Sequence, residues 1–237
     1  MYILKGGISL IHNIEVYILL FFIYSFGGWL LEVFCRLVAD RRFINRGFLI
    51  GPYCPIYGTG ALLMTFLLKR YLSDPFTLFI MAMLICSILE YITSFVMEKL
   101  FNARWWDYSH YRFNINGRIC LETTIPFGIF GFLICYVMNP FLLNYIEMLP
   151  QIALLIIDIL LVIVFFIDNI ISFKVILSVK KATSEISKTI KDNTEEITRR
   201  VKETLKEKSY IAKRLINAFP SFESVKLKIK ERISNKE

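Results

Sequence analysis

Five long apolar stretches constrain what this chain of 237 residues can fold into. A helix needs about 20 mainly apolar residues to cross the hydrocarbon core of a bilayer, and each stretch approaches that length. The stretches cover residues 16–38, 48–68, 76–97, 119–146 and 149–173. Hydrophobic residues make up 56% of the sequence, which is more apolar surface than one water-soluble domain of this size can bury. The sequence therefore predicts an all-α, polytopic membrane protein with about five transmembrane helices.

The charged residues divide the chain into two parts. Residues 1–173 contain eleven basic and eleven acidic side chains, whereas residues 174–237 contain seventeen basic and nine acidic ones. The net charge of +8 therefore belongs to the C-terminal end. We expect a transmembrane domain over residues 1–177 and a basic, cytoplasmic helical tail over residues 178–237.

Lysine and arginine in the short connections predict the orientation, because these residues are retained on the cytoplasmic side of a membrane. Most of them lie in the first connection, in the third connection and at the start of the tail: Arg41, Arg42, Arg46, Lys99, Arg104, Arg112, Arg118 and Lys174. The opposite side has Lys5, Lys69 and Arg70. We expect five crossings of a bacterial cytoplasmic membrane, with the N-terminus outside and the C-terminus in the cytoplasm.

The second apolar stretch begins with residues that interrupt helices. Gly51, Pro52 and Pro55 occur close together there, and proline removes a backbone donor from a helix. Irregular backbone at membrane depth is tolerated where it is buried in protein or lines a cavity. We therefore expect a broken or re-entrant beginning to this span.

The first and second helical hairpins carry similar residues at similar spacing. Each has a glutamate in its first helix, an Asn, an Arg and a Gly in its connection, and Pro and Gly near the start of its second helix. Gly47 and Gly58 are eleven residues apart, as are Gly117 and Gly128. The pattern favours a parallel two-helix repeat about an axis along the membrane normal. The alternative is that Asn, Gly and Pro are simply common in loops that enter membranes.

The tail contains an apolar stripe at helical spacing, formed by Ile186, Ile190, Ile197, Val201 and Leu205. Lysine and glutamate surround it, so we expect an amphipathic helix. Such a helix can lie on anionic lipid, form a homo-oligomer as a coiled coil, or dock a soluble partner. We expect no nucleic-acid binding, because a helix tethered to a bilayer meets acidic lipid first.

Four acids lie within the apolar stretches: Glu32, Glu90, Asp158 and Asp168. A carboxylate in a membrane is costly unless it is paired or protonated, so such residues are candidate functional groups. Glu32, Glu90 and Asp168 each lie about 10 Å from the cytoplasmic ends of their helices, and we expect them to line one polar cavity. Basic and amide side chains nearby complete the candidate site: Arg36, Asn45, Arg46 and Arg118. Arg36 lies one helical turn from Glu32 and can neutralise it. A purely structural ion-pair cluster is the alternative, and Asp158 has no evident partner.

The third connection adds aromatic and polar candidates. Trp105, Trp106 and Asp107 are consecutive, and Asn116 and Arg118 follow. Tandem tryptophans at a membrane end usually act as interfacial anchors. Together with Arg, Asp and Asn they also suit a lipid-headgroup or polar-ligand site.

Several enzyme and cofactor classes lack their motifs in this sequence. There is no GxxxxGK[ST] loop for ATP, no HExxH pair, and no GxSxG or SxxK nucleophile motif. Only two histidines occur, and the five cysteines form no CxxC pair. We therefore expect no metal, no cofactor and no enzymatic activity.

Four strings carry a resemblance to a known family. They are GGWLLEVFCR (27–36), RRFINRGFLIGPYCPIYGTGALL (41–63), MEKLFNARWWDYS (97–109) and FNINGRICLE (113–122). Over residues 14–150 the chain resembles the bacterial family labelled "putative ABC-transporter permease", type IV or CmpB-like. The resemblance implies a permease that works with a separate ATPase subunit. The matching positions are Glu32, Asn45, Arg46, Gly47, Gly51, Pro52, Pro55, Gly58, Glu90, Trp105, Trp106, Asp107, Tyr108, Asn116, Gly117 and Arg118.

Three functions follow as hypotheses. The favoured one is a permease-like protein that binds or moves a small substrate through a polar cavity open to the cytoplasm. The second is a membrane enzyme or lipid-headgroup-binding protein that uses Glu32 and Glu90 as acid and base. The third is a membrane scaffold that recruits partners through its tail.

Overall fold

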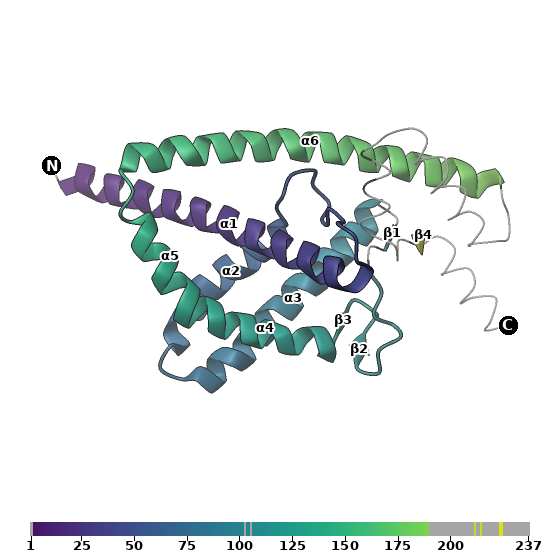
Figure 1. The fold of residues 1–237 in the computed structure, drawn as a ribbon, viewed down its shortest axis with the longest axis horizontal. Helices are drawn as coiled ribbons and strands as arrows, with labels where there is room; N and C mark the ends of the chain where they lie inside the picture. The colour runs from purple at the N-terminus through teal and green to yellow at the C-terminus, as the bar shows by residue number, and fades with distance from the viewer. Residues whose placement is uncertain are drawn as a thin grey trace. The chain divides into compact units, whose positions relative to one another are not determined.

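The computed structural model describes residues 2–101, 103–104, 106–189, 211, 214 and 223–224. It is 76% helical, which confirms the prediction of an all-α chain. The helices are α1 (Tyr2–Asp40), α2 (Pro55–Leu67), α3 (Pro75–Phe101), α4 (Leu121–Leu133), α5 (Asn139–Ile146) and α6 (Gln151–Thr189), as labelled in Figure 1. A π-helical turn, η2 (Ile134–Met138), joins α4 to α5, and a short 3₁₀ turn, η1 (Lys69–Tyr71), follows α2.

Two pairs of very short strands accompany the helices. Strands β2 (Asn114–Ile115) and β3 (Ile119–Cys120) pair antiparallel within the third connection. Strand β1 (Ala103–Arg104) pairs antiparallel with β4 (Glu223–Ser224).

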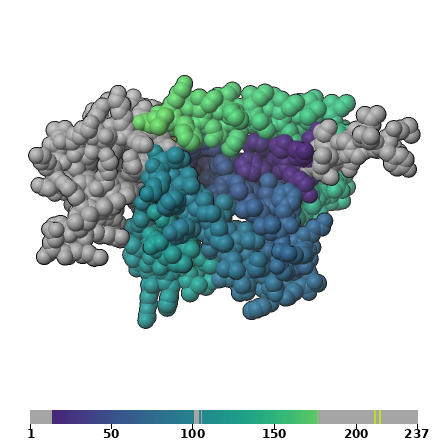
Figure 2. Space-filling view, turned by 180° about the vertical axis from the view of Figure 1, so that it is seen from behind, coloured from purple at the N-terminus to yellow at the C-terminus, as the bar shows by residue number. Residues whose placement is uncertain are grey.

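Four helical segments are long and apolar enough to cross a membrane: Ile14–Asp40, Pro75–Leu100, Leu121–Ile146 and Gln151–Val175. They confirm the polytopic architecture and four of the five predicted spans. Large apolar side chains such as Ile152 and Phe166 are exposed on α6, which lies at the surface in Figure 2 (green). Lipid contact explains this exposure, because hydrocarbon solvates apolar side chains and water does not.

The second predicted span is shorter than the other four. Its helix α2 has 13 residues and begins at Pro55, after the non-helical residues 41–54. At 1.5 Å per residue α2 is about 20 Å long, less than the ~30 Å hydrocarbon core. Pro55 is suited to the first turn, because a helix leaves its first backbone donors unused. The expected broken beginning is therefore confirmed, whereas the number of crossings and their orientation stay predictions.

The chain forms two compact units that are interleaved in the sequence. The apolar unit comprises Met1–Leu31, Gly51–Leu89 and Leu121–Ile167, and the polar unit comprises Glu32–Ile50, Glu90–Cys120 and Asp168–Glu237. Helices α1, α3 and α6 each contribute to both units. The predicted tail helix over residues 178–237 lies mostly outside the described residues, and the boundary at residue 177 stays a prediction.

Close helix crossings in the apolar unit occur at two glycines of the predicted repeat. A Cβ on Gly58 of α2 would lie 2.5 Å from the backbone oxygen of Phe21 in α1. A Cβ on Gly128 of α4 would lie 2.5 Å from the ring of Phe79 in α3. Within this unit α4 therefore lies against α3 (Figure 1), as α2 lies against α1. The two hairpins share this construction, and the symmetry axis between them stays a prediction.

Candidate functional site

The candidate site residues of the sequence lie mainly in the polar unit, where Asp168 of α6 holds the first connection. Its carboxylate accepts hydrogen bonds from the backbone N–H of Ile50 and the hydroxyl of Ser172, both at 2.9 Å. The amide of Asn45 donates to the carbonyl of Ile50 at 3.1 Å. The backbone N–H and the backbone carbonyl of Ile50 therefore each have a side-chain partner. Nearby, the ring of Phe48 packs edge-on against the ring of Phe173. These contacts give Asp168 and Asn45 an anchoring role in the structure.

Ion pairs in the first connection differ from the simplest sequence expectation. We expected Arg36 to neutralise Glu32 one turn away. In the structure Arg46 reaches back to Glu32, with 3.2 Å between Nε and Oε2, and Arg36 pairs with Asp40 at 3.4 Å. Arg46 can compete with Arg36 for Glu32 because the first connection folds back towards Glu32 of α1. Residue spacing within the helix does not reveal this fold-back.

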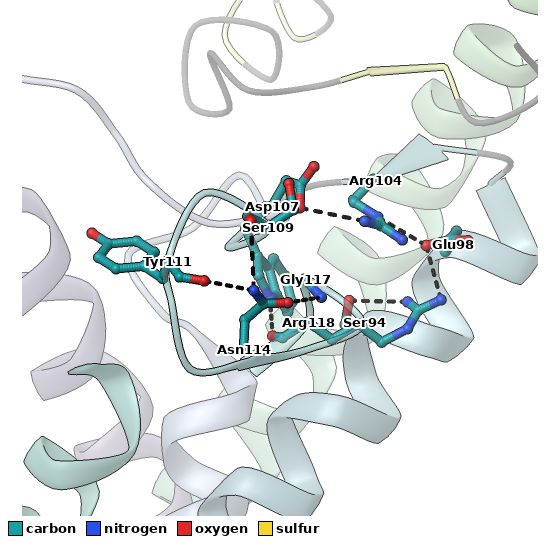
Figure 3. A network of polar contacts seen from close by, with 10 residues as sticks. Ser94, Glu98, Arg104, Asp107, Ser109, Tyr111, Asn114, Gly117 and Arg118 are labelled. Carbon is teal, nitrogen blue, oxygen red and sulfur yellow. Dashed lines mark hydrogen bonds and ion pairs between the residues drawn. The ribbon is translucent and has the colours of Figure 1, made fainter. Parts of the chain in front are cut away.

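A charge-balanced network fixes the third connection (Figure 3). Oε2 of Glu98 lies 3.2 Å from Nε of Arg104 and 3.0 Å from Nη2 of Arg118. Arg104 also pairs with Asp107 at 3.3 Å, and Arg118 donates to the hydroxyl of Ser94 at 3.2 Å. Two arginines therefore meet two acids in a mostly buried setting. Asp107 and Arg118 were predicted, whereas Glu98 was missed although it lies in the string MEKLFNARWWDYS.

Strands β2 and β3 turn at Asn116 and Gly117, where the backbone adopts left-handed φ values of 55° and 66°. The backbone N–H of Gly117 donates to the side chain of Asn114 at 2.9 Å, and that of Arg118 donates to Ile115 at 3.0 Å. Asn116 donates to the hydroxyl of Tyr91 at 2.9 Å. The hairpin was not predicted, although an Asn-Gly pair is a strong turn signal because both residues tolerate positive φ.

The aromatic residues of the third connection attach it to this hairpin. The indole N–H of Trp106 donates to the backbone oxygen of Arg118 at 3.1 Å. The backbone N–H of Tyr108 donates to the oxygen of Gly117 at 2.8 Å. Trp105 lies outside the described residues. The predicted anchor and headgroup roles of the tryptophans stay predictions.

Glu90 of α3 lies in a second group of polar side chains, the Glu90 cluster, formed by Glu32, Glu90 and Tyr108. The hydroxyl of Tyr108 donates to Oε1 of Glu90 at 3.3 Å. The charges of Glu32 and Glu90 are close enough to interact, so the structure brings these two predicted site residues together. Oε2 of Glu90 is buried and has no hydrogen-bond partner among the described residues. A buried acceptor without a partner is costly, and such groups often mark functional sites.

The charge balance distinguishes Glu90 from Glu32, Glu98 and Asp107 in the polar unit. Glu32 pairs with Arg46, and Glu98 and Asp107 pair with arginines. Burial, reinforced by the charge of Glu90, raises the pKa of the Tyr108 hydroxyl, so Tyr108 remains a neutral donor. Within the part of the chain that the structure describes, Glu90 has no cationic partner. The cluster therefore presents one uncompensated carboxylate.

The comparison with known families identifies the group to which these motifs belong. A family model described as "Putative ABC-transporter type IV" matches residues 19–173. The chain belongs to this family. The match covers the Glu90 cluster and the first and third connections. It ends at residue 173, close to the end of the apolar segment Gln151–Val175 in α6. Membership in this family and the four long apolar helices together indicate a multi-pass membrane protein. No curated protein and no solved structure matches the chain.

Residues missed by sequence reasoning form a buried polar chain in the apolar unit of this family member. The hydroxyl of Tyr24 donates to Oδ1 of Asn139 at 2.7 Å, and Nδ2 of Asn139 donates to the hydroxyl of Thr65 at 2.9 Å. Asn139 directly follows η2, and π-helical turns often occur at functional sites. The available signal was an Asn within an apolar stretch, next to Pro140. The three residues satisfy one another and cross-link α1, α2 and α5.

Proposed function

We propose that this chain is the membrane-spanning subunit of a transporter that binds a small, positively charged substrate at the Glu90 cluster. A separate ATPase is the energy source, since the chain has no nucleotide-binding motif of the GxxxxGK[ST] type. Family membership supports the transporter class, and the cluster supports the choice of site.

The buried, unpartnered Oε2 of Glu90 carries the proposal. A carboxylate oxygen accepts hydrogen bonds and favours positive charge, so an N–H donor on a cationic group complements it. Three arginines of the polar unit, Arg46, Arg104 and Arg118, already pair with Glu32, Glu98 and Asp107. An ammonium or guanidinium substrate therefore fits the site better than a phosphate does.

Aromatic rings around the cluster suit the same ligand class. The hydroxyl of Tyr108 is hydrogen-bonded to Glu90, and the centroid of its ring lies 6.0 Å from that of the Tyr111 ring. Cations are attracted to the faces of aromatic rings, with ~0.5 to 2 kcal/mol gained per contact. An organic cation can thus use one carboxylate and adjoining rings, while Tyr108 orients the carboxylate.

The ligand class is testable with purified full-length protein and small organic cations. We expect putrescine or agmatine to raise the thermal unfolding midpoint of the natural protein and of Glu122→Gln, which alters an exposed acid at the start of α4. The shift should disappear in Glu90→Gln. Equal shifts in Glu90→Gln, or none with any amine tested, would remove the support for a cation site.

The partner is testable separately. Affinity purification in mild detergent should recover a nucleotide-binding protein with the natural chain and with Glu90→Gln, because the substitution changes the site and leaves the fold. Repeated purification without such a protein counts against an ATPase-driven transporter, whatever the outcome of the ligand experiment.

A lipid-headgroup function is the second candidate, because ethanolamine headgroups also carry an ammonium group. In that case Glu90→Gln in cells should change the lipid composition measured by mass spectrometry, and Glu122→Gln should not. An unchanged lipid profile leaves the transporter as the better proposal. The scaffold function depends on the tail over residues 178–237, and deletion of these residues is its own test.

A further inference from the structure

The turn that joins α2 to α3 (Figure 1) carries an open cavity that the proposed substrate site does not use. The cavity has a volume of about 480 Å³ and is lined by Phe66, Leu67, Lys69 and Arg70. All four residues belong to the apolar unit, whereas Glu90 belongs to the polar unit. The lining therefore combines two apolar side chains with two basic ones.

This turn is fixed to the helices of the apolar unit. Leu68 is fully buried, and its backbone N–H donates to the oxygen of Met64 at 2.9 Å. The N–H of Tyr71 donates in turn to the oxygen of Leu68 at 2.8 Å. From η2, the hydroxyl of Tyr136 donates to the oxygen of Leu72 at 2.9 Å. The backbone is thus held in place, while the four lining residues remain exposed.

The two basic side chains of the turn have no acidic partner. Among the described residues, the ion pairs involve other arginines and neither Lys69 nor Arg70. Arg70 lies over the ring of Tyr71, 5.0 Å from its centroid. The acid of this turn, Asp74, accepts hydrogen bonds from the backbone N–H and the hydroxyl of Thr77 at the start of α3. The cavity therefore presents two positive charges that await an anion.

Exposed apolar side chains lie before and after the basic pair. Phe66 and Leu67 end α2, and Phe76 is the second residue of the apolar segment Pro75–Leu100. Hydrocarbon covers such side chains in a membrane protein, whereas Lys and Arg keep their charged ends in the polar headgroup region. The turn therefore lies at the boundary between hydrocarbon and headgroups, where the phosphates of lipids are found.

We propose that this cavity binds an anionic phospholipid. Its phosphate pairs with Lys69 and Arg70, because an ammonium and a guanidinium group donate charge-assisted hydrogen bonds to phosphate oxygens. One acyl chain lies against Phe66 and Leu67 and removes their apolar surface from water. A zwitterionic lipid carries its own cation beside the phosphate, so the basic pair favours a lipid with net negative charge. A free phosphate uses only the basic half of the lining.

Native mass spectrometry of the full-length protein in mild detergent tests the preference for charge. Phosphatidylglycerol and phosphatidylcholine with the same acyl chains are titrated in parallel. Each basic residue contributes about fivefold to the binding of an acidic lipid, so we expect phosphatidylglycerol to bind about 25-fold more tightly. The double variant Lys69→Gln/Arg70→Gln should bind the two lipids equally. An unchanged preference in this variant overturns the proposal.

The first connection offers a matched control for net charge. Arg41 and Arg42 are also adjacent and exposed, and Arg41→Gln/Arg42→Gln removes the same two charges. This control should keep the preference of the natural protein for phosphatidylglycerol. An equal loss in the two double variants would show a general effect of net charge and would overturn the site.

A photoreactive lipid tests the position of the site and the source of the phosphate. The protein is placed in phosphatidylcholine nanodiscs with phosphatidylglycerol that carries a diazirine in its acyl chain. We expect adducts on the peptide that contains Phe66 and Leu67, and at least fivefold fewer in Lys69→Gln/Arg70→Gln. Glycerol 3-phosphate should not compete, because it has no acyl chain. Equal adducts in the natural protein and the variant, or suppression by glycerol 3-phosphate, overturn the assignment to a lipid.

The lipid site and the substrate site can fail separately. Glu90→Gln should leave the adducts at Phe66 and Leu67 unchanged, because it alters a residue of the polar unit. The amine-induced thermal shift should likewise persist in Lys69→Gln/Arg70→Gln. Loss of the adducts in Glu90→Gln would contradict an independent lipid site.

Discussion

Asp168 accepts a hydrogen bond from the backbone N–H of Ile50 at 2.9 Å, across 118 positions of sequence. This bond joins the first connection to α6 and uses one of the acids that the sequence marks as costly. Because Asp168 also accepts from Ser172, its buried carboxylate has two donors in place of water. Asp168, which the sequence suggested as a substrate ligand, therefore has a structural role in holding the first connection.

Removing this anchor should loosen the first connection. Asp168→Ala leaves the N–H of Ile50 and the hydroxyl of Ser172 without their acceptor, and we expect a loss of about 2 kcal/mol in the free energy of unfolding. Proteolysis between residues 41 and 50 should become faster. The matched control is Asp40→Ala, whose partly exposed pair with Arg36 contributes about 0.5 kcal/mol or less. Equal losses in the two variants would contradict an anchoring role.

Glu98 should be the most sensitive acid of the third connection. Glu98→Gln leaves Arg104 and Arg118 without a shared carboxylate, and both guanidinium groups are largely buried. We expect a loss of about 3 kcal/mol, measured by unfolding in SDS, because an unpaired buried charge is costly. A double-mutant cycle with Arg118→Gln checks this: the loss in the double variant should be smaller than the sum of the two single losses. Strict additivity would show that the pair does not interact.

The turn at Gly117 should tolerate no side chain. Its φ of +66° disfavours L-residues, and a Cβ would collide with a carboxylate oxygen of Asp107 and lie 3.1 Å from Nη1 of Arg104. Gly117→Ala should cost about 1 to 3 kcal/mol. Gly27→Ala is the control, because nothing lies within 4 Å of its Cβ position in α1. We expect that substitution to stabilise the helix by up to about 1 kcal/mol, as alanine does relative to glycine. Thermal unfolding midpoints of both variants in one detergent provide the measurement.

Alkaline pH should destabilise the protein through Tyr108. Burial raises the pKa of its hydroxyl above the ordinary tyrosine value of 10.0, with a further contribution from the charge of Glu90. The folded state thus binds this proton more tightly than the unfolded state does. The corresponding stability is fully present below pH 10 and is lost as the pH rises through the folded-state pKa.

Tyr108→Phe isolates this contribution, because phenylalanine has no ionisable group. Between pH 8 and pH 11 we expect the unfolding midpoint of the natural protein to fall more steeply than that of Tyr108→Phe. Tyr111→Phe, at a residue whose surface is 37% exposed, should follow the natural protein. Parallel pH profiles for all three proteins would contradict a buried, protonated Tyr108.

The long apolar stretches made most of the architecture predictable. The spans predicted over 16–38, 76–97, 119–146 and 149–173 match the apolar helical segments Ile14–Asp40, Pro75–Leu100, Leu121–Ile146 and Gln151–Val175 to within a few residues at each end. The prolines near residue 52 indicated an irregular beginning, and α2 starts at Pro55. Helix formation in an apolar stretch is a local requirement, since each backbone group must be paired within the segment.

The partners of the polar residues were decided by tertiary structure. The sequence marked Glu32, Glu90, Asp158 and Asp168 as costly, because hydrocarbon does not solvate a carboxylate whatever its neighbours are. It could not show that Asp168 holds a backbone N–H, or that Oε2 of Glu90 stays without a donor. Those outcomes depend on which chain segments meet, often more than a hundred positions apart, and residue spacing within one helix carries no information about that.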